Sequence, residues 1–408
     1  MRVLFISDVY FPRVNGVSTS IRTFRADLAT AGVETVLVAP TYPAAAAGHT
    51  APDPAVPEEA GVVRVSSSGV IGDAEDRRMH WGALRTTLDA LSCTQHFDLV
   101  HVHTPFVAHY AGVGFGRRQR IPVIATYHTF FEEYLHHYVP LLPRVVGRAV
   151  ARRFTRSQCA ELAAVIAPSE PMRALLSEYG VRARTTVIPT GLPPDRFVQG
   201  VGARFRAQYG LSPERPLLLY VGRVAHEKNI EFLLQMFVEV RRVRPDALLV
   251  IAGEGPARAS LRAQTLALGI AQDVVFVGYL ERNRALVDCY AAADVFVFAS
   301  RTETQGLVLL EALAQGRPVV STAYLGTASV LQPNCGAHVA PEQPDVFADA
   351  VLHVLDDPAR AALLSAQART YAASWTSARM AARLAELYAE VARGSVSAAS
   401  TLAAAALR

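Results

Sequence analysis

Short runs of β-branched and apolar residues alternate with longer segments of helical periodicity along most of this chain. The first series of expected strands comprises residues 3–7, 34–39, 62–65, 99–102, 123–126, 164–167 and 186–188. Helical periodicity lies between them, for example in residues 17–30 and 81–91. Strands and helices that alternate in this way form βαβ units, with parallel strands and helices on both faces of the sheet. The pattern therefore predicts an α/β fold.

A second series of the same kind begins near Pro216. Its expected strands are residues 217–221, 247–252, 274–277, 295–299 and 318–321. Residues 188–194, rich in Pro and Gly, separate the two series and are typical of a linker. The 408 residues also exceed what one hydrophobic core usually supports. We expect two doubly wound domains, residues 1–190 and 191–375, which face a central cleft and bind ligands at the carboxyl ends of their strands.

Residues 376–408 form a third segment. After Pro344 the pattern is helical to about Ala392, which predicts a C-terminal helix that can cross back to the first domain. The chain then ends in the low-complexity sequence SVSAASTLAAAALR, for which we expect a flexible tail.

Composition excludes several classes of protein. The formal net charge is +4 and no dense run of cations occurs, so a nucleic-acid partner is not expected. The four cysteines stand far apart, without the spacing of a zinc site or a disulfide framework, and indicate a reducing compartment. The N-terminus lacks the pattern of a signal peptide, and no apolar run reaches the length of a spanning helix. We expect a cytoplasmic protein whose contact with a membrane is peripheral.

Two acids bracket an expected helix start in the second domain. Glu303 lies in a polar loop after a strand, and Glu311 follows on the second turn of an apolar helix that starts near Gly306. Free amides at a helix start can bind a diphosphate, while carboxylates accept hydrogen bonds from sugar hydroxyls. An isolated E-x7-E pair is more often surface charge, and here its position after a strand favours a sugar-nucleotide site.

Two cations lie at the entrance of another helix. Gly222 and Arg223 follow the strand 217–221, and Lys228 comes five residues after Arg223. An arginine fork and a lysine point charge can together neutralise a departing diphosphate. Such a pair alone is usually surface charge.

Together these motifs resemble family-four glycosyltransferases of the GT-B fold. The resemblance is carried by G-R-x4-K-N, which starts at Gly222, and by E-T-Q-G-L-V-x2-E-A-x-A-x-G-x-P-V-V, which starts at Glu303. It extends to the first strand and the loop Phe11-Pro12-Arg13-Val14-Asn15-Gly16-Val17. The resemblance implies a retaining hexosyltransferase that uses a nucleotide-diphosphate sugar.

The resemblance also implies roles for individual residues. Arg223 and Lys228 would hold the diphosphate, Glu303 the donor hexose and Glu311 the ribose. Donor contacts would also come from Gly16, Gly222, Thr304, Gln305, Gly306 and Leu307. Family members more often have Gly-Gly at Asn15-Gly16 and Gly-Phe or similar at Thr304-Gln305.

A histidine is expected at the cleft from the first domain. His128 follows the strand 123–126, and in the family a histidine here orients the reacting sugar. His101 and His103, at the end of the strand 99–102, either line the same cleft or are structural. These three histidines are the candidates of the first domain for contact with substrate.

No cofactor or metal is expected. The sequence contains no Asp-x-Asp, the carboxylate pair by which many other glycosyltransferases hold a divalent ion. Cationic side chains and helix amides would then replace the ion. The family resemblance implies attack on the same face of the sugar, with the leaving phosphate accepting the acceptor's proton.

The segment after His128 indicates a lipid acceptor. It is aromatic up to Pro143 and continues into a helix in which Arg144, Arg148 and Arg152 repeat every four residues beside an apolar face. Such a helix is either a core helix with solvated arginines or one that lies on an anionic membrane surface. The string His-Thr-x2-Glu-x-Tyr-x2-His-Tyr, which starts at His128, is similar to bacterial diacylglycerol glucosyltransferases. Its acceptor-binding candidates are Tyr127, Glu132, Tyr134 and His137.

These features predict transfer of a hexose to a membrane-lipid hydroxyl at the inner face of the cell membrane. UDP-glucose is the first donor candidate. GDP-mannose is the second donor candidate, and a soluble or polysaccharide acceptor remains open. A sugar-nucleotide epimerase has the same architecture, and a non-catalytic sugar-nucleotide sensor is a third class. Arg223, Lys228, Glu303 and His128 occur together, which favours the transferase over the sensor.

Overall fold

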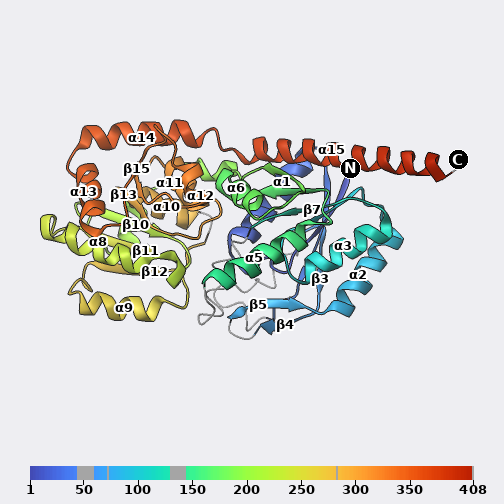
Figure 1. The fold of residues 1–408 in the computed structure, drawn as a ribbon. Coiled ribbons are helices and arrows are strands. Elements are labelled where there is room, and N and C mark those ends of the chain that lie inside the picture. The colour runs from blue at the N-terminus through green and yellow to red at the C-terminus, as the bar shows by residue number, and fades with distance from the viewer. Residues whose placement is uncertain (44–58, 71–72, 129–143, 282–283, 407–408) are drawn as a thin grey trace. The chain divides into compact units, whose positions relative to one another are not determined.

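Both series of strands form parallel sheets, one in each of two compact units (Figure 1). The structure is a computed structural model that describes residues 1–43, 59–70, 73–128, 144–281 and 284–406. Unit 1 consists of Met1–Gly191 and Ser377–Arg408, and unit 2 consists of Leu192–Thr376. Each unit has its own hydrophobic core. The prediction of an α/β fold with two Rossmann-like domains is confirmed.

Unit 1 contains a seven-stranded parallel sheet in the order β3-β2-β1-β6-β7-β8-β9. Its strands are β1 (Arg2–Ile6), β2 (Glu34–Pro40), β3 (Val62–Val65), β6 (Leu99–Val102), β7 (Val123–Thr126), β8 (Ala164–Ala167) and β9 (Arg184–Val187). β6 and β8 are buried along their whole length, as expected where helices cover both faces of a sheet. The chain proceeds from β1 to β3 in one direction and from β6 to β9 in the other. The strand order therefore reverses between β1 and β6.

Helices cover both faces of this sheet. The helices of unit 1 are α1 (Gly16–Thr30), α2 (Trp81–Thr94), α3 (Val107–Gln119), α5 (Arg144–Cys159), α6 (Glu170–Glu178) and α15 (Ser377–Ala406). Right-handed crossovers place α3, α5 and α6 on one face and α1 on the other. α15 packs against α1, and Figure 1 shows these two helices side by side.

α1 begins at a cap that the sequence encodes. The side-chain oxygen of Asn15 accepts a hydrogen bond of 2.9 Å from the amide of Ser18, which has no partner within the helix. Ile21, Phe24 and Leu28, spaced three and four residues apart, are buried. The expected helix 17–30 thus forms within one residue of its predicted bounds.

α15 extends beyond the point where the sequence predicts a flexible tail. The helix starts at Ser377 and continues to Ala406. The last part of the chain is rich in alanine, which has the highest helix propensity, and this accounts for the difference. Leu384 and Tyr388 on this helix are buried, so the helix is part of unit 1.

Unit 2 contains a six-stranded parallel sheet in the order β12-β11-β10-β13-β14-β15. Its strands are β10 (Leu217–Val221), β11 (Leu248–Ala252), β12 (Val274–Gly278), β13 (Val295–Phe298), β14 (Val319–Ser321) and β15 (Ala337–Val339). The strand order reverses between β10 and β13. In sheets of this kind ligands bind at the carboxyl ends of the strands where the order reverses.

Helices of unit 2 connect these strands. They are α7 (Gly202–Gln208), α8 (Ile230–Val243), α9 (Arg258–Ala267), α10 (Arg284–Ala292), α11 (Leu307–Ala314), α12 (Gly326–Val330), α13 (Pro344–Leu355) and α14 (Pro358–Ala372), with short 3-10 turns η3 (Pro194–Arg196) and η4 (His226–Lys228).

Three strands were not predicted. β4 (Ser67–Val70) and β5 (Asp73–Met79) form an antiparallel hairpin, and β15 is the edge strand of unit 2. The sequences SSGV, DAEDRRM and AHV lack the apolar runs that mark a buried strand.

Candidate active site

The residues expected to hold a diphosphate lie where the strand order of unit 2 reverses. Gly222 and Arg223 follow β10, and the loop that contains Glu303 follows β13. β10 and β13 are neighbours, so both loops emerge from the same edge of the sheet. Two motifs about 80 residues apart in the sequence thus meet at the expected ligand site.

Lys228 and Glu303 form an ion pair at this edge. The ammonium of Lys228 donates a hydrogen bond of 2.5 Å to Oε1 of Glu303, and their side chains are 19% and 21% exposed. Lys228 ends η4, and the next residue, Asn229, has a left-handed backbone with φ of 57°. A charged pair that is this accessible can exchange partners when a ligand arrives. The structure therefore pairs the residue predicted to hold the diphosphate, Lys228, with the residue predicted to hold the hexose, Glu303.

Arg223 lies on the same loop but has another acidic neighbour. Its guanidinium is 3.8 Å from the carboxylate of Glu227, and its side chain is 41% exposed. Its carbonyl accepts a hydrogen bond from the hydroxyl of Tyr220. Arg223 thus lies, partly exposed, at the surface of unit 2 on the loop that also carries Lys228.

Glycines allow the loops of β10 and β11 to approach each other. The amide of Gly222 donates to the carbonyl of Ala252 at 3.0 Å. A Cβ at Gly253 would lie 1.9 Å from the carbonyl oxygen of Gly222, closer than any side chain permits. Gly253 was not singled out from the sequence, because the contact depends on the pairing of two strands.

Two glycines determine the backbone course of loop 303–306, which precedes α11. Gly306 has a φ of 90°, in the left-handed region that favours glycine. The amide of Gly326 donates to the carbonyl of Glu303 at 2.8 Å, and a Cβ at Gly326 would lie 2.1 Å from the carbonyl carbon of Thr304. The loop therefore rests directly on the backbone of α12. Gln305 is buried, and Leu307 is the first residue of α11.

Glu311 lies inside unit 2. It is 2% exposed, and its Oε2 accepts a hydrogen bond of 2.9 Å from the hydroxyl of Tyr290. Its other oxygen is 3.7 Å from the guanidinium of the buried Arg196. Its role toward ribose stays a prediction. Tyr290 and Arg196 were missed, because neither stands next to Glu311 in the sequence.

A third acid connects the two loops. The side-chain amide of Asn229 donates to Glu342 at 2.9 Å, and Nε of Arg301 donates to the other oxygen of Glu342 at 2.7 Å. Asn229 is adjacent to Lys228, and Arg301 lies two residues before Glu303. Glu342 follows the unpredicted strand β15, so no pattern in the sequence indicated its place.

Unit 1 brings its histidines together at the carboxyl ends of β6 and β7, next to the point where its strand order reverses. His103 follows β6 and His128 follows β7. Nδ1 of His103 is 3.4 Å from Nε2 of His128, and the two rings stack with centroids 5.7 Å apart. Burial lowers the pKa of His128 to about 4, and it lowers the pKa values of His101 and His103 well below the ordinary value. All three imidazoles are neutral at physiological pH.

Gly16 is the first residue of α1. A Cβ there would meet no atom within 4 Å, so its own unit leaves space above this backbone. The fold of α1 does not require a glycine at this position, because its φ is not in the left-handed region. The contact of Gly16 with the donor stays a prediction.

The acceptor-binding candidates are only partly described. Tyr127 is 9% exposed, and its hydroxyl lies 3.0 Å from that of Thr155 on α5. Glu132, Tyr134 and His137 lie outside the described residues.

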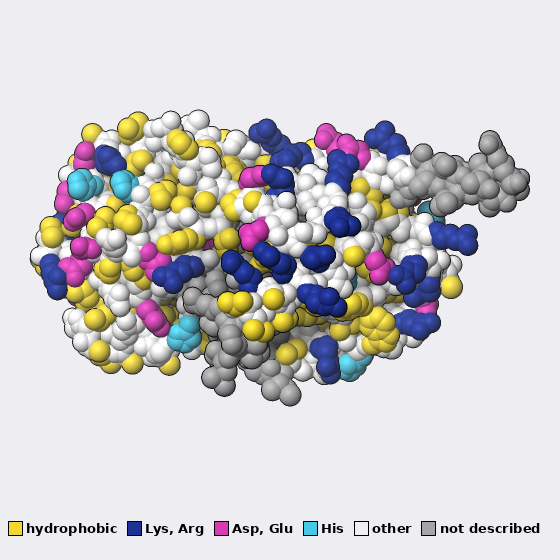
Figure 2. Space-filling view, in the orientation of Figure 1, with side chains coloured by type: hydrophobic (Ala, Val, Ile, Leu, Met, Phe, Trp, Pro, Cys, Tyr) yellow, Lys and Arg dark blue, Asp and Glu magenta, His cyan; other side chains and the backbone are white. Residues whose placement is uncertain are grey.

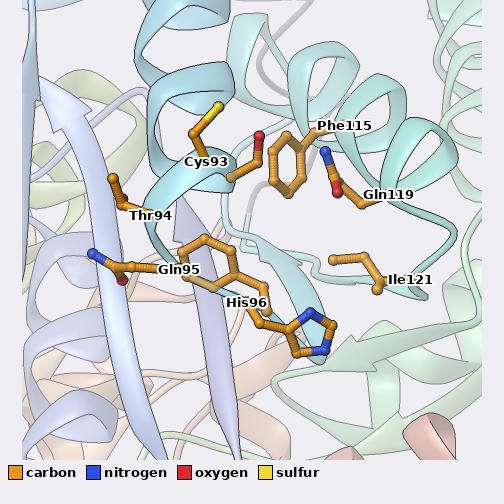
Figure 3. Close-up of a pocket in the computed structure, with 9 residues that line it drawn as sticks. Cys93, Thr94, Gln95, His96, Phe115, Gln119 and Ile121 are labelled. Carbon is orange, nitrogen blue, oxygen red and sulfur yellow. The ribbon is translucent and has the colours of Figure 1, made fainter.

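A separate pocket occurs at the opposite edge of the sheet of unit 1. Cys93, Thr94, Gln95 and His96 line it together with side chains of α3 (Figure 3). α2 leads into β6 and α3 leads into β7, so this pocket lies at the amino ends of the strands. It contains none of the predicted site residues.

No group of three or more His, Cys, Asp or Glu side chains in the described part could hold a metal ion. No helix of the described part is long and apolar enough to cross a membrane.

Family models match both halves of the chain. The model described as Glycosyltransferase Family 4 matches residues 14–196, and the model described as Glycosyl transferases group 1 matches residues 203–371.

Individual relatives agree with these matches. The chain is 33% identical over 326 residues to alpha-monoglucosyldiacylglycerol synthase of Streptococcus pneumoniae, which covers 79% of this chain and 71% of the relative. It is 35% identical over 222 residues to GDP-mannose-dependent alpha-(1-6)-phosphatidylinositol monomannoside mannosyltransferase of Mycolicibacterium smegmatis, covering 52% of this chain and 58% of the relative. The solved structure of Anabaena HepE in complex with UDP has a TM-score of 0.73 at 17% identity, covering 96% of this chain and 100% of that chain. The chain therefore belongs to glycosyltransferase family 4, close to the diacylglycerol glucosyltransferases, and is a sugar-transferring enzyme with the GT-B fold.

Proposed function

We propose that this enzyme transfers glucose from UDP-glucose to a hydroxyl of diacylglycerol or a related membrane lipid, with retention of anomeric configuration and without a metal ion. The observation that carries the proposal is the accessible Lys228–Glu303 ion pair at the strand switch point of unit 2. The name of the Streptococcus pneumoniae relative supports a glucosyl donor and a lipid acceptor.

The chemistry of the donor follows from the charges at this edge. When the bond between the glucose C1 and the phosphate oxygen breaks, negative charge develops on the diphosphate. Lys228, Arg223 and the amides at the start of α11 stabilise that charge. Lys228 moves from Glu303 to the phosphate, and Glu303 is then free to accept hydrogen bonds from glucose hydroxyls. Glu311 accepts a hydrogen bond from the ribose.

Unit 1 contributes neutral groups. His128 orients the hexose as a hydrogen-bonding imidazole, because burial keeps it uncharged at physiological pH. Gly16 leaves room for the donor above its backbone. The leaving phosphate accepts the proton of the lipid hydroxyl as that oxygen bonds to C1 on the same face.

The acceptor is brought to the enzyme by α5. Val145, Val146 and Val150 are exposed on this helix at 82%, 46% and 46%, beside the exposed Arg148 and Arg153. Figure 2 shows cationic side chains gathered over the part of the surface where Figure 1 places α5. Apolar side chains among cations fit an anionic membrane surface. We propose a peripheral location on the inner face of the cell membrane.

A donor panel with lipid acceptors tests the proposal. The purified enzyme is incubated with UDP-glucose, UDP-galactose or GDP-mannose and with diacylglycerol, phosphatidylinositol or a soluble glycan, and products are identified by mass spectrometry. Glucosyldiacylglycerol from UDP-glucose is the expected product. Mannosylated phosphatidylinositol from GDP-mannose would replace both donor and acceptor. The Mycolicibacterium relative is named for GDP-mannose-dependent mannosyl transfer with phosphatidylinositol monomannoside.

A parallel incubation without acceptor separates a transferase from an epimerase. Slow release of UDP and free glucose is expected. Conversion of the donor to its epimer would refute the transfer reaction.

A further inference from the structure

Three imidazoles form a column at the carboxyl ends of β6 and β7. The rings of His101 and His103 lie with centroids 4.0 Å apart, and the ring of His128 stacks on His103 at 5.7 Å. Phe5 packs against His101 and His103 at 5.0 and 4.7 Å. The column is therefore fixed by packing as well as by hydrogen bonds.

His101 uses both of its ring nitrogens within the protein. Nδ1 lies 2.6 Å from the hydroxyl of Tyr388 on α15, and Nε2 lies 2.7 Å from the hydroxyl of Thr126. A neutral imidazole has one N–H and one lone pair, and these two hydroxyls satisfy both. His101 is thus a structural residue with no nitrogen left for a substrate.

His103 differs from His101 in one nitrogen. It is 2% exposed, and its Nδ1 faces Nε2 of His128. Its Nε2 is buried and has no hydrogen-bond partner among the residues that the structure describes. The proton of this neutral ring must lie on one of these two nitrogens.

The two tautomers have different consequences. If His103 carried its proton on Nε2, a buried N–H would remain without an acceptor among the described residues, and His128 would have to donate. If the proton lies on Nδ1, only a lone pair remains unpartnered. Native structures tolerate an under-used acceptor more readily than an orphaned buried N–H. The second arrangement is therefore favoured, with His103 as donor and Nε2 of His128 as acceptor.

We propose that His103 is a positioning residue: its Nδ1–H holds Nε2 of His128 as an acceptor and thereby places the proton of His128 on Nδ1. The hydrogen bond at one ring nitrogen decides which tautomer the other nitrogen shows. His128 then presents an N–H donor at Nδ1. The consequence for catalysis rests on the proposed function, in which this donor orients a hydroxyl of the hexose.

Nuclear magnetic resonance of protein with ¹⁵N-labelled histidine reads the tautomers directly. The expected spectrum shows both His103 and His128 with the proton on Nδ1. In the variant His103→Leu, His128 loses its donor and is expected to shift toward the Nε2–H form. In His103→Asn, whose side-chain amide can replace the Nδ1–H, the Nδ1–H form of His128 is expected to persist.

A matched control removes a neighbouring buried hydrogen bond. Tyr388→Phe deletes the hydroxyl next to His101 and leaves the bond between His103 and His128 intact. It should leave the His128 tautomer unchanged. Thermal unfolding of each variant checks that the column still forms.

Kinetics give a second readout. His103→Leu should lower kcat by about tenfold, in line with other residues that orient a functional histidine, with little change in the KM for the donor. His103→Asn should recover most of that loss. An Nε2–H tautomer of His103 in the unaltered protein, or equal kcat values for the two variants, would overturn the proposal. Absence of any glycoside from the unaltered enzyme would refute the proposed function alone, because the spectrum does not depend on it.

Discussion

Lys228 is the only lysine in the 408-residue sequence. Every other basic side chain apart from histidine is an arginine, so a compact ammonium occurs only beside Glu303. Lysine offers a point charge on a flexible stem, whereas arginine offers a planar fork. The ion pair to Glu303 keeps that ammonium at the strand switch point while no ligand is bound. At the scale of the residue, Glu303 thus holds in place the charge that the proposed function assigns to the diphosphate.

Replacing Glu303 should affect UDP binding and the rate of sugar transfer in opposite ways. Glu303→Gln removes the acid that competes with phosphate for Lys228, so UDP affinity should stay equal or rise. The transfer rate should fall by roughly 100-fold, because the hexose hydroxyls lose a hydrogen bond to a charged carboxylate, and this bond is stronger in the transition state. Calorimetry and initial rates measure the two quantities. Weaker UDP binding together with an unchanged rate would contradict the assignment.

Asp8 gives a prediction about stability. It follows β1, is 6% exposed, and accepts hydrogen bonds from Thr104 and from the amide of Ala108. Burial raises the pKa of Asp8 from 3.8 to about 6. The folded state therefore favours the protonated form. The stability that this proton confers is complete below pH 4 and is lost as the pH rises through about 6.

Asp8→Asn removes this titration and keeps an oxygen that can accept from Ala108. The free energy of unfolding of the unaltered protein, relative to the variant, should fall by up to about 3 kcal/mol between pH 4 and pH 7.5. Urea unfolding at the two pH values measures the difference. The comparison cancels the buried histidines, which the two proteins share. An identical difference at both pH values would be incompatible with a raised pKa.

At the scale of the element, α5 carries the predicted membrane contact. Arg148→Gln with Arg153→Gln should weaken binding to vesicles of anionic lipid by roughly 30-fold at low salt, since each basic residue near such a surface contributes about 1 kcal/mol. Sedimentation with vesicles measures this loss, and neutral vesicles should retain neither protein.

A control with the same loss of charge comes from α3. Arg117→Gln with Arg118→Gln alters two exposed arginines at the other end of the unit 1 sheet, near the amino ends of its strands. Their ion pairs with Glu161 and Asp89 are exposed and contribute little to stability. Equal loss of binding in both variants would assign the effect to net charge and would remove α5 from the account.

Periodicity predicted most elements that position the site. The strands that end at Val221 and Phe298, and the helix that begins after Gly306, lie within one residue of their expected bounds. The strand β15 was not predicted, because it is a partly exposed edge strand whose sequence, AHV, lacks a run of apolar residues. Glu342, which joins the loops of Lys228 and Glu303, follows that strand and was missed with it.

At the scale of the whole molecule, the missing information is which distant residues meet. His101 forms a hydrogen bond with Tyr388, which lies 287 residues later in the chain. Glu311 lies beside Arg196, which comes from the start of unit 2. Each residue alone has the appearance of an ordinary buried tyrosine or surface arginine. The motifs identified the chemistry, while the partners that hold the motif residues depend on packing.

The proposed function assigns the diphosphate of the donor to Lys228. Since it is the only lysine, protein labelled with ¹³C-lysine gives a single Cε resonance that can be followed during titration. UDP should move this resonance strongly, and uridine, which lacks phosphate, should not. A resonance that stays in place while calorimetry shows UDP bound, or that moves equally with uridine, would contradict this role of Lys228.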